Sequence, residues 1–242
     1  MRLPPIAQST AFTRLHLTVI LGIASVLLIV GLITAIPTIP SGGDQRRLEA
    51  RNTCSQICAA INGYYAEYGE FPPLLSPSAV SSQTKRASAD AIVGDPAMKV
   101  QQRNDTIFYT LRNIPKGPNE GRAANLSRIV FFDARAAVLS VAGKPRAGFF
   151  DPTADGQRAA GDWCFYDPWG QQYGIILDTN GDGRIDLSGI YSDFAGVDPT
   201  TGKAPQRRAG AFSMGKDKML GTKGDRLYRR GSEVSDDVIS WE

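Results

Sequence analysis

The feature that most constrains this chain is an apolar run near its N-terminus, residues 17–36, which carries no charged side chain over twenty positions. A helix rises about 1.5 Å per residue, so twenty residues cross the roughly 30 Å hydrocarbon core of a bilayer. The apolar region of a secretory signal peptide is shorter. The run therefore predicts one transmembrane helix, with membrane lipid as a partner. Arg2 and Arg14 precede it, which under the positive-inside rule favours a cytoplasmic N-terminus.

A break rich in Pro and Gly follows at residues 37–43 and should end the membrane helix. A second, amphipathic helix is expected over residues 44–70, opened by Asp44 and stopped before Phe-Pro-Pro at 71–73. Its apolar side chains recur every three or four residues, so they form one stripe that needs a sheet to pack against. The predicted stripe comprises Leu48, Cys54, Ile57, Cys58, Ile61, Tyr64, Tyr65 and Tyr68.

The sequence of residues 71–242 predicts turns and short strands. Residues 71–161 form a loop-rich region with a short helix at 105–114, and residues 162–242 form a sheet region with acidic, Gly-rich loops. The expected fold class is α+β, a transmembrane and amphipathic N-terminal helix followed by a small antiparallel β-sheet with long loops. A hairpin is expected around the Asp-Pro-Trp-Gly turn at 167–170. The β-like segments are 127–132, 162–166, 173–177, 190–194, 210–214 and 237–241.

Charge and histidine content exclude several functions. The chain has 27 basic and 24 acidic residues, so no electrostatic case exists for nucleic acid as the main partner. Its one histidine, His16, lies at the edge of the apolar run. A Ser-His-Asp triad, a Cys-His pair and a His-ligated zinc site are therefore unavailable to the remainder. We expect a protein that is not an enzyme, with a tethered carboxylate-dependent hydrolase as an alternative.

Three cysteines, Cys54, Cys58 and Cys164, leave two interpretations open. Cys54 and Cys58 are four residues apart and share a helix face, so they fit a buried apolar stripe as small side chains. Alternatively, one of them forms a disulfide with Cys164 if the domain is exported. In either case at least one thiol is unpaired.

An acidic, Gly-rich segment at residues 178–186 indicates a calcium loop. Oxygen-bearing side chains at alternate positions, with Gly at the sixth, are typical of the EF-hand loop. Its twelfth position, which should hold a bidentate Glu, is Gly189, so a replacement ligand is needed. The alternative is a β-turn in which Asp and Asn cap backbone amides without metal. The predicted calcium ligands are Asp178, Asn180, Asp182, the carbonyl of Arg184, Asp186 and, as the replacement, Asp193.

Four motifs follow the apolar run in order along the chain. They are Ala-Glu-Tyr-Gly-Glu-Phe-Pro-Pro at 66–73, Asp-Pro-Trp-Gly at 167–170, Ser-Met-Gly-Lys-Asp at 213–217 and Asp-Asp-Val-Ile-Ser-Trp at 236–241. With a single hydrophobic helix behind a short leader, this order resembles the type IV pilin-like proteins. It is most similar to the major pseudopilins of type II secretion.

The resemblance implies a membrane-anchored subunit without catalytic activity. It implies a leader at residues 1–11, cut between Ala11 and Phe12 by a prepilin peptidase, and a membrane helix at 12–36 that packs with other pilin-like subunits in a helical fibre. It places the protein in the bacterial inner membrane as a single-pass protein with a periplasmic C-terminal domain. It also implies a sheet of about four strands and calcium in the C-terminal loop, held by Asp217 with Asp236 or Asp237.

The leader departs from the family pattern at two positions. Arg14 interrupts the apolar start, and His16 stands where the family carries Glu. That Glu is thought to neutralise the amino terminus of a neighbouring subunit, which a neutral His cannot do. These departures favour a second hypothesis, a membrane-tethered periplasmic binding module that does not polymerise.

Overall fold

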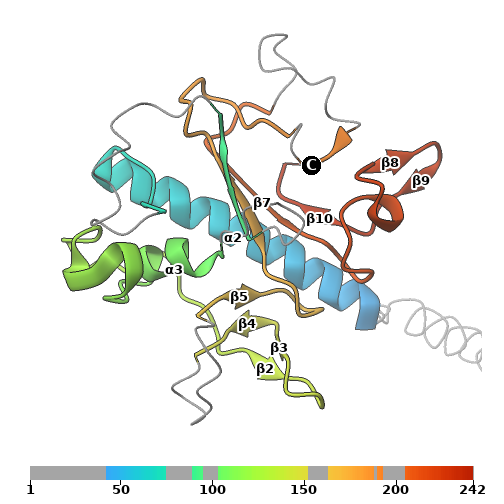
Figure 1. Ribbon diagram of the computed structural model, residues 1–242, viewed down its shortest axis with the longest axis horizontal. Coiled ribbons are helices and arrows are strands. Elements are labelled where there is room, and N and C mark those ends of the chain that lie inside the picture. The colour runs from blue at the N-terminus through green and yellow to red at the C-terminus, as the bar shows by residue number, and fades with distance from the viewer. Residues whose placement is uncertain are drawn as a thin grey trace, which may run out of the picture. The chain divides into compact units, whose positions relative to one another are not determined.

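Four short strands form the main sheet of the computed structural model, which describes residues 42–74, 89–94, 103–151, 163–187, 190–192 and 205–241 (Figure 1). Every neighbouring pair is antiparallel, in the order β1-β6-β7-β10. The predicted α+β class with an antiparallel sheet is confirmed. The strands are β1 (Ala91–Val93), β6 (Gly174–Leu177), β7 (Ala209–Ser213) and β10 (Val238–Ile239).

The predicted leader, the membrane helix and residues 37–41 of the break lie outside the described residues. Within the described part of the chain, none of the helices has the length and hydropathy needed to cross a bilayer.

The long helix α2 (Gly42–Tyr68) confirms the predicted amphipathic helix and crosses the sheet against β7 and β10 (Figure 1). It ends at Gly69, whose φ of 73° reverses the chain while its N–H bonds the carbonyl of Tyr65 at 2.8 Å. Leu48, predicted in the stripe, is 56% exposed, and Ala50 is buried instead. The buried residues of α2 are Ala50, Cys54, Ile57, Cys58, Ala60, Ile61 and Tyr64.

The sheet is buried on both faces, because its alternating side chains place apolar residues on each of them. Along β6, Ile175 and Leu177 enter the core under α2, while Ile176 points to the other face. Along β7, Ala211 faces α2 and Phe212 faces away. Small side chains on β7 therefore lie toward the helix, which allows close approach, and large ones fill the second core.

In the described part of the chain, loops and turns rather than an α-helix cover the second core, and the sheet contributes Ile176, Phe212 and Ile239 to it. Tyr191, which was expected in an edge strand at 190–194, is completely buried here outside any strand. Loop residues pack with Phe212 of the sheet to cover this face. The buried members of this core are Ile176, Ile185, Leu187, Ile190, Tyr191, Phe212, Met214, Leu220, Tyr228 and Ile239.

Smaller elements complete the described structure. Helix α3 (Asp105–Leu111) confirms the predicted short helix and packs beside α2. Three two-stranded pairs lie outside the main sheet. The remaining elements are η2 (Gly117–Arg122), β2 (Val138–Leu139), β3 (Pro145–Arg146), β4 (Gly148–Phe149), β5 (Phe165–Tyr166), η5 (Thr222–Gly224), β8 (Arg229–Arg230) and β9 (Glu233–Val234).

Three strand expectations were wrong or incomplete. The predicted hairpin of 162–166 with 173–177 is reduced to a single bridge, Tyr166 to Gln172, because β5 pairs with β4 while β6 pairs with β1 and β7. Residues 127–132 form no strand; the backbone N–H groups of Phe131 and Phe132 bond the last carbonyl of α3 instead. Strand β1 was not predicted.

A test of the helix-to-sheet contact compares two members of the predicted stripe. Ile61 is completely buried, so Ile61→Ala should lower the free energy of unfolding by about 2–5 kcal/mol through lost burial and a residual cavity. Leu48→Ala, at the exposed position, should change it by no more than about 0.5 kcal/mol. Urea unfolding followed by circular dichroism measures both. Equal losses for the two variants would contradict the observed orientation of α2.

Candidate cation-binding loops

The Asp-Pro-Trp-Gly turn is fixed to the sheet through Asp167, which is completely buried. Its Oδ1 accepts hydrogen bonds from the N–H of Trp169 (2.9 Å) and Gln171 (2.8 Å), and its Oδ2 accepts one from the Ser213 hydroxyl (2.6 Å). Burial raises the pKa of Asp167 to about 6, against the opposing effect of these hydrogen bonds. Asp167 thus ties the turn to the end of β7 and has a structural role.

The predicted calcium loop begins where β6 ends, and Asp178 organises it. Oδ1 of Asp178 accepts hydrogen bonds from the N–H of Gly181 (2.7 Å) and Asp182 (3.1 Å), and Oδ2 accepts one from Gly183 (2.9 Å). Gly181 and Gly183 have φ of 72° and 81°, which glycine adopts without steric cost. This is the amide-capping turn that the metal-free alternative predicts.

The other predicted ligands of this loop bond each other's backbone. Asn180 Oδ1 accepts from the N–H of Asp182 at 2.9 Å, and Asp182 Oδ1 accepts from the N–H of Arg184 at 2.8 Å. Asp186 lies at the base of the loop, where its N–H donates to Asp90. Asp193 lies outside the described residues. The loop is therefore a turn held by hydrogen bonds from backbone N–H groups to the side-chain oxygens of Asp178, Asn180 and Asp182.

Asp90 joins this loop from a distant part of the chain. It precedes β1, whose pairing of Ala91 with Leu177 sets Asp90 beside Asp178. Its Oδ2 accepts the N–H of Asp186 at 2.6 Å, and its buried Oδ1 has no hydrogen-bond partner among the described residues. Burial, together with the charges of Asp178 and Asp182, raises the pKa of Asp90 to about 6. The sequence did not predict Asp90 as part of this loop, because the segment around it shows little periodicity. The pairing of β1 with β6 brings it there.

The C-terminal loop brings two of its predicted ligands, Asp217 and Asp236, together and leaves Asp237 apart. Asp236 Oδ2 accepts the N–H groups of Lys216 (2.6 Å) and Asp217 (3.1 Å), and Asp217 Oδ1 accepts that of Met219 (2.9 Å). Burial raises the pKa of Asp217, and the charge of Asp236 adds to the rise. Both of these carboxylates hydrogen-bond at the exposed surface.

Asp237 is completely buried instead. Its Oδ2 accepts hydrogen bonds from the Tyr191 hydroxyl (2.8 Å) and the Gly221 N–H (2.7 Å), and its Oδ1 has no partner in the described part of the chain. Burial raises the pKa of Asp237 to about 7. Asp237 therefore belongs to the second core and does not join Asp217.

The two loops belong to opposite edges of the sheet. The first contacts β1 and the second leads to β10, and these are the two outer strands. Among the residues that the structure describes, no three or more Asp, Glu, Cys or His side chains are grouped closely enough to hold a metal ion. The oxygen-only side chains of the first loop still suit a hard cation such as Ca²⁺.

The three cysteines are buried thiols. The Sγ of Cys54 lies 3.9 Å from the carbonyl oxygen of Val238, and the Sγ of Cys58 lies 3.4 Å from the Ser240 hydroxyl. Burial raises the pKa of both thiols, which keeps them protonated at neutral pH. Cys54 and Cys58 thus attach α2 to β10 as small packed side chains. The predicted cleavage residues Ala11 and Phe12 lie outside the described residues.

Replacing Asp90 tests the electrostatics of the first loop. Its folded-state pKa of about 6 exceeds the ordinary value of 3.8, so its stabilising contribution is complete below pH 3.8 and is lost as the pH rises through 6. In calcium-free buffer, Asp90→Asn should therefore flatten the fall in the free energy of unfolding between about pH 4 and pH 6. Urea titrations at several pH values measure this.

Asp182→Asn is the matched variant, because it keeps Asp90 but removes one neighbouring charge. It should give a slope between those of the wild type and Asp90→Asn. Identical slopes for all three proteins would show that Asp90 is not buried against the loop.

Comparison of the chain with known protein families, curated proteins and solved structures found no match.

Proposed function

We propose that this chain is a membrane-anchored, non-enzymatic pilin-like subunit of a type II secretion or type IV pilus-like fibre, with an extracytoplasmic domain stabilised by calcium. One observation carries the proposal. A long helix, α2, starts six residues after the uncharged run at 17–36 and packs its buried stripe on an antiparallel four-stranded sheet. The helix and the sheet are what the resemblance to pseudopilins implies.

The proposed role requires anchoring and packing rather than chemistry. The uncharged run supplies the anchor, since it is long enough to span a bilayer. The domain supplies a rigid displayed surface, because α2 and the loops bury both faces of its sheet. In such a subunit the membrane helices pack with those of neighbouring copies in the fibre.

We place calcium at the loop 178–186 rather than at the C-terminal loop. Asp90 has a buried oxygen without a partner among the described residues, beside Asp178 and Asp182, and a divalent cation would relieve the repulsion among these carboxylates. The amide bonds of Asp178 do not exclude ligation, since a carboxylate oxygen has two lone pairs. Asp90 would then take the place of the ligand missing at Gly189. Calcium supplies charge neutralisation and stiffens the loop against β1.

Thermal unfolding of the full chain in detergent, with calcium or with chelator, tests the metal. Calcium at 100 times its dissociation constant should stabilise the folded state by about 2.7 kcal/mol and raise Tm accordingly. Asp90→Asn and Asp178→Asn should abolish the increase, while Asp217→Asn should retain it. An increase that survives Asp90→Asn but disappears in Asp217→Asn would move the site to the C-terminal loop. No increase in the wild type would remove calcium from the proposal.

The departures at Arg14 and His16 favour the second candidate, a tethered binding module. Mass spectrometry of the N-terminus of protein purified from its native membranes separates the two. A mature chain that begins at Phe12 supports the fibre subunit. An intact chain beginning at Met1 supports the tethered module and contradicts processing by a prepilin peptidase.

A further inference from the structure

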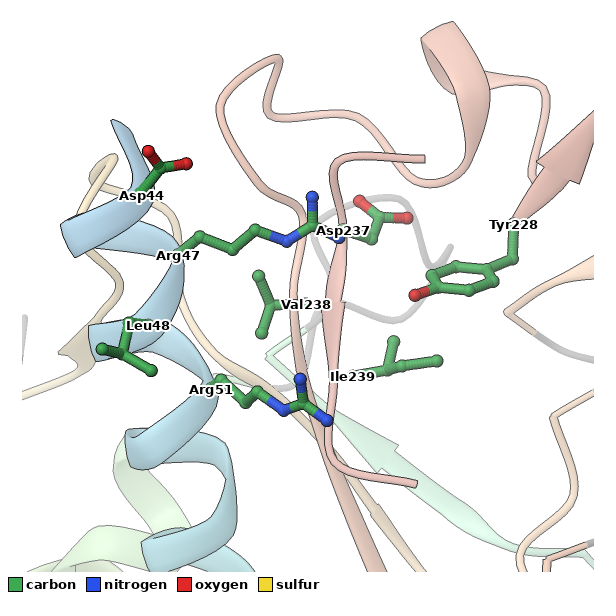
Figure 2. A pocket seen from close by; sticks show the side chains of 8 residues that line it. All are labelled: Asp44, Arg47, Leu48, Arg51, Tyr228, Asp237, Val238 and Ile239. Atoms are coloured by element: carbon green, nitrogen blue, oxygen red, sulfur yellow. The ribbon is translucent and has the colours of Figure 1, made fainter. Parts of the chain in front are cut away.

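A charged cavity lies between the first turns of α2 and strand β10 (Figure 2). Its volume is about 230 Å³, which corresponds to roughly eight water molecules at about 30 Å³ each. Three of its lining residues, Asp237, Val238 and Ile239, belong to the motif at 236–241, and the other five lie outside the four motifs. The lining residues are Asp44, Arg47, Leu48, Arg51, Tyr228, Asp237, Val238 and Ile239.

Two arginines give the cavity a site for an anion. Arg47 and Arg51 are four residues apart on α2, so they share one face of the helix. Figure 2 shows both side chains extended toward β10, with the guanidinium of Arg47 reaching toward Asp237. A guanidinium presents its N–H donors as a planar fork that matches phosphate or carboxylate oxygens.

Asp237 gives the same cavity an acceptor. Its Oδ2 is engaged by Tyr191 and Gly221, whereas its Oδ1 is buried and has no partner in the described part of the chain. Leaving a buried carboxylate oxygen unpaired costs about 1–3 kcal/mol or more, so a donor that reaches it is favoured. Asp44 adds a second carboxylate to the lining. A ligand that satisfies the cavity therefore carries both an anionic group and an N–H donor.

We propose that this cavity binds the phosphoethanolamine headgroup of a membrane lipid, with the phosphate on Arg47 and Arg51 and the ammonium on Asp237. The source of the headgroup rests on the proposed function, because it needs residues 17–36 to be in the membrane. Five residues, 37–41, lie between the end of that run and Gly42, and an extended chain covers at most about 3.6 Å per residue. The six Cα-to-Cα steps from residue 36 to Gly42 therefore span at most about 22 Å, which favours lipid headgroups as the source of the ligand.

Binding of soluble headgroups to the full chain in detergent tests the proposal. Calorimetric titration with glycerophosphoethanolamine should show saturable binding. Glycerophosphocholine, which lacks an N–H donor, and glycerol phosphate, which lacks the amine, should each bind about tenfold more weakly. Equal affinity for all three would reduce the site to an anion site and overturn the proposal, as would an absence of binding.

Arg47→Gln is the informative variant, because Arg47 is exposed and its replacement leaves the core intact. It should weaken glycerophosphoethanolamine binding about tenfold. Arg46→Gln, the same charge change at an adjacent residue that does not line the cavity, should leave binding unchanged. Equal effects of the two variants would indicate non-specific attraction. A loss of thermal stability in Arg47→Gln without any headgroup binding would show that Arg47 only pairs with Asp237.

Nanodiscs separate the lipid source from a free solute. Wild-type protein should protect nanodisc phosphatidylethanolamine from amine-reactive labelling more than Arg47→Gln does. Headgroup binding in solution without this protection would assign the site to a soluble zwitterion and overturn the lipid assignment. Whether the full chain stays in the membrane fraction after cell lysis is measured in a separate experiment. A retained chain without headgroup binding contradicts only this inference, whereas an unretained chain contradicts the membrane anchor.

Discussion

The structure depends on the burial of one face of α2 against the sheet. Ile57, Ile61 and Tyr64 are completely buried, and burying each such side chain stabilises the fold by about 1.5–3 kcal/mol. The small side chains of β7 that face the helix permit this contact. Because strand side chains alternate, the same strands send Ile176 and Phe212 to the other face, and the loops must cover them. The second core is therefore a consequence of the first.

Buried polar side chains then fix the connections around these cores. Asn104 is completely buried; its Nδ2 donates to the carbonyls of Phe165 (2.9 Å) and Tyr173 (3.0 Å), and its Oδ1 accepts from the N–H of Phe165 (3.0 Å). Asp167 links the next turn to Ser213 in the same way. Since an unpaired buried polar group costs about 1–3 kcal/mol, these side chains select one path for each loop. Asp90 and Asp237 are among the exceptions in the described part of the chain, each with one oxygen that has no hydrogen-bond partner there.

The sequence predicted the elements whose signal is local. The periodic stripe of α2, the strand predicted at 210–214 and observed at 209–213, and the turn at 167–170 follow from side-chain spacing and turn chemistry. It did not predict β1, because a strand of three residues is defined by its partner β6. Residues 127–132 have the composition of a strand, but the N–H groups of Phe131 and Phe132 bond the carbonyl of Leu111 at the end of α3. Leu48 fits the spacing yet is exposed, beside the cavity between α2 and β10.

The same limit applies to the candidate site. The spacing of Asp178, Asn180 and Asp182 indicated a loop with ordered oxygens, and the structure shows these residues in one turn. Asp90 could not be assigned to it, because 88 positions separate Asp90 from Asp178 and only the register of two strands brings them together. Asp236 and Asp237 were treated as equivalent, whereas neighbouring residues at a strand point to opposite sides. One is at the surface and the other is buried.

We propose that β1 and the loop 178–186 form one cation-binding unit. Hydrogen exchange of the full chain, measured by mass spectrometry with calcium or with chelator, tests it most directly. Calcium should slow amide exchange in both 89–94 and 178–187 and leave 216–237 unchanged. Slower exchange confined to 216–237, or no difference anywhere, would contradict the account.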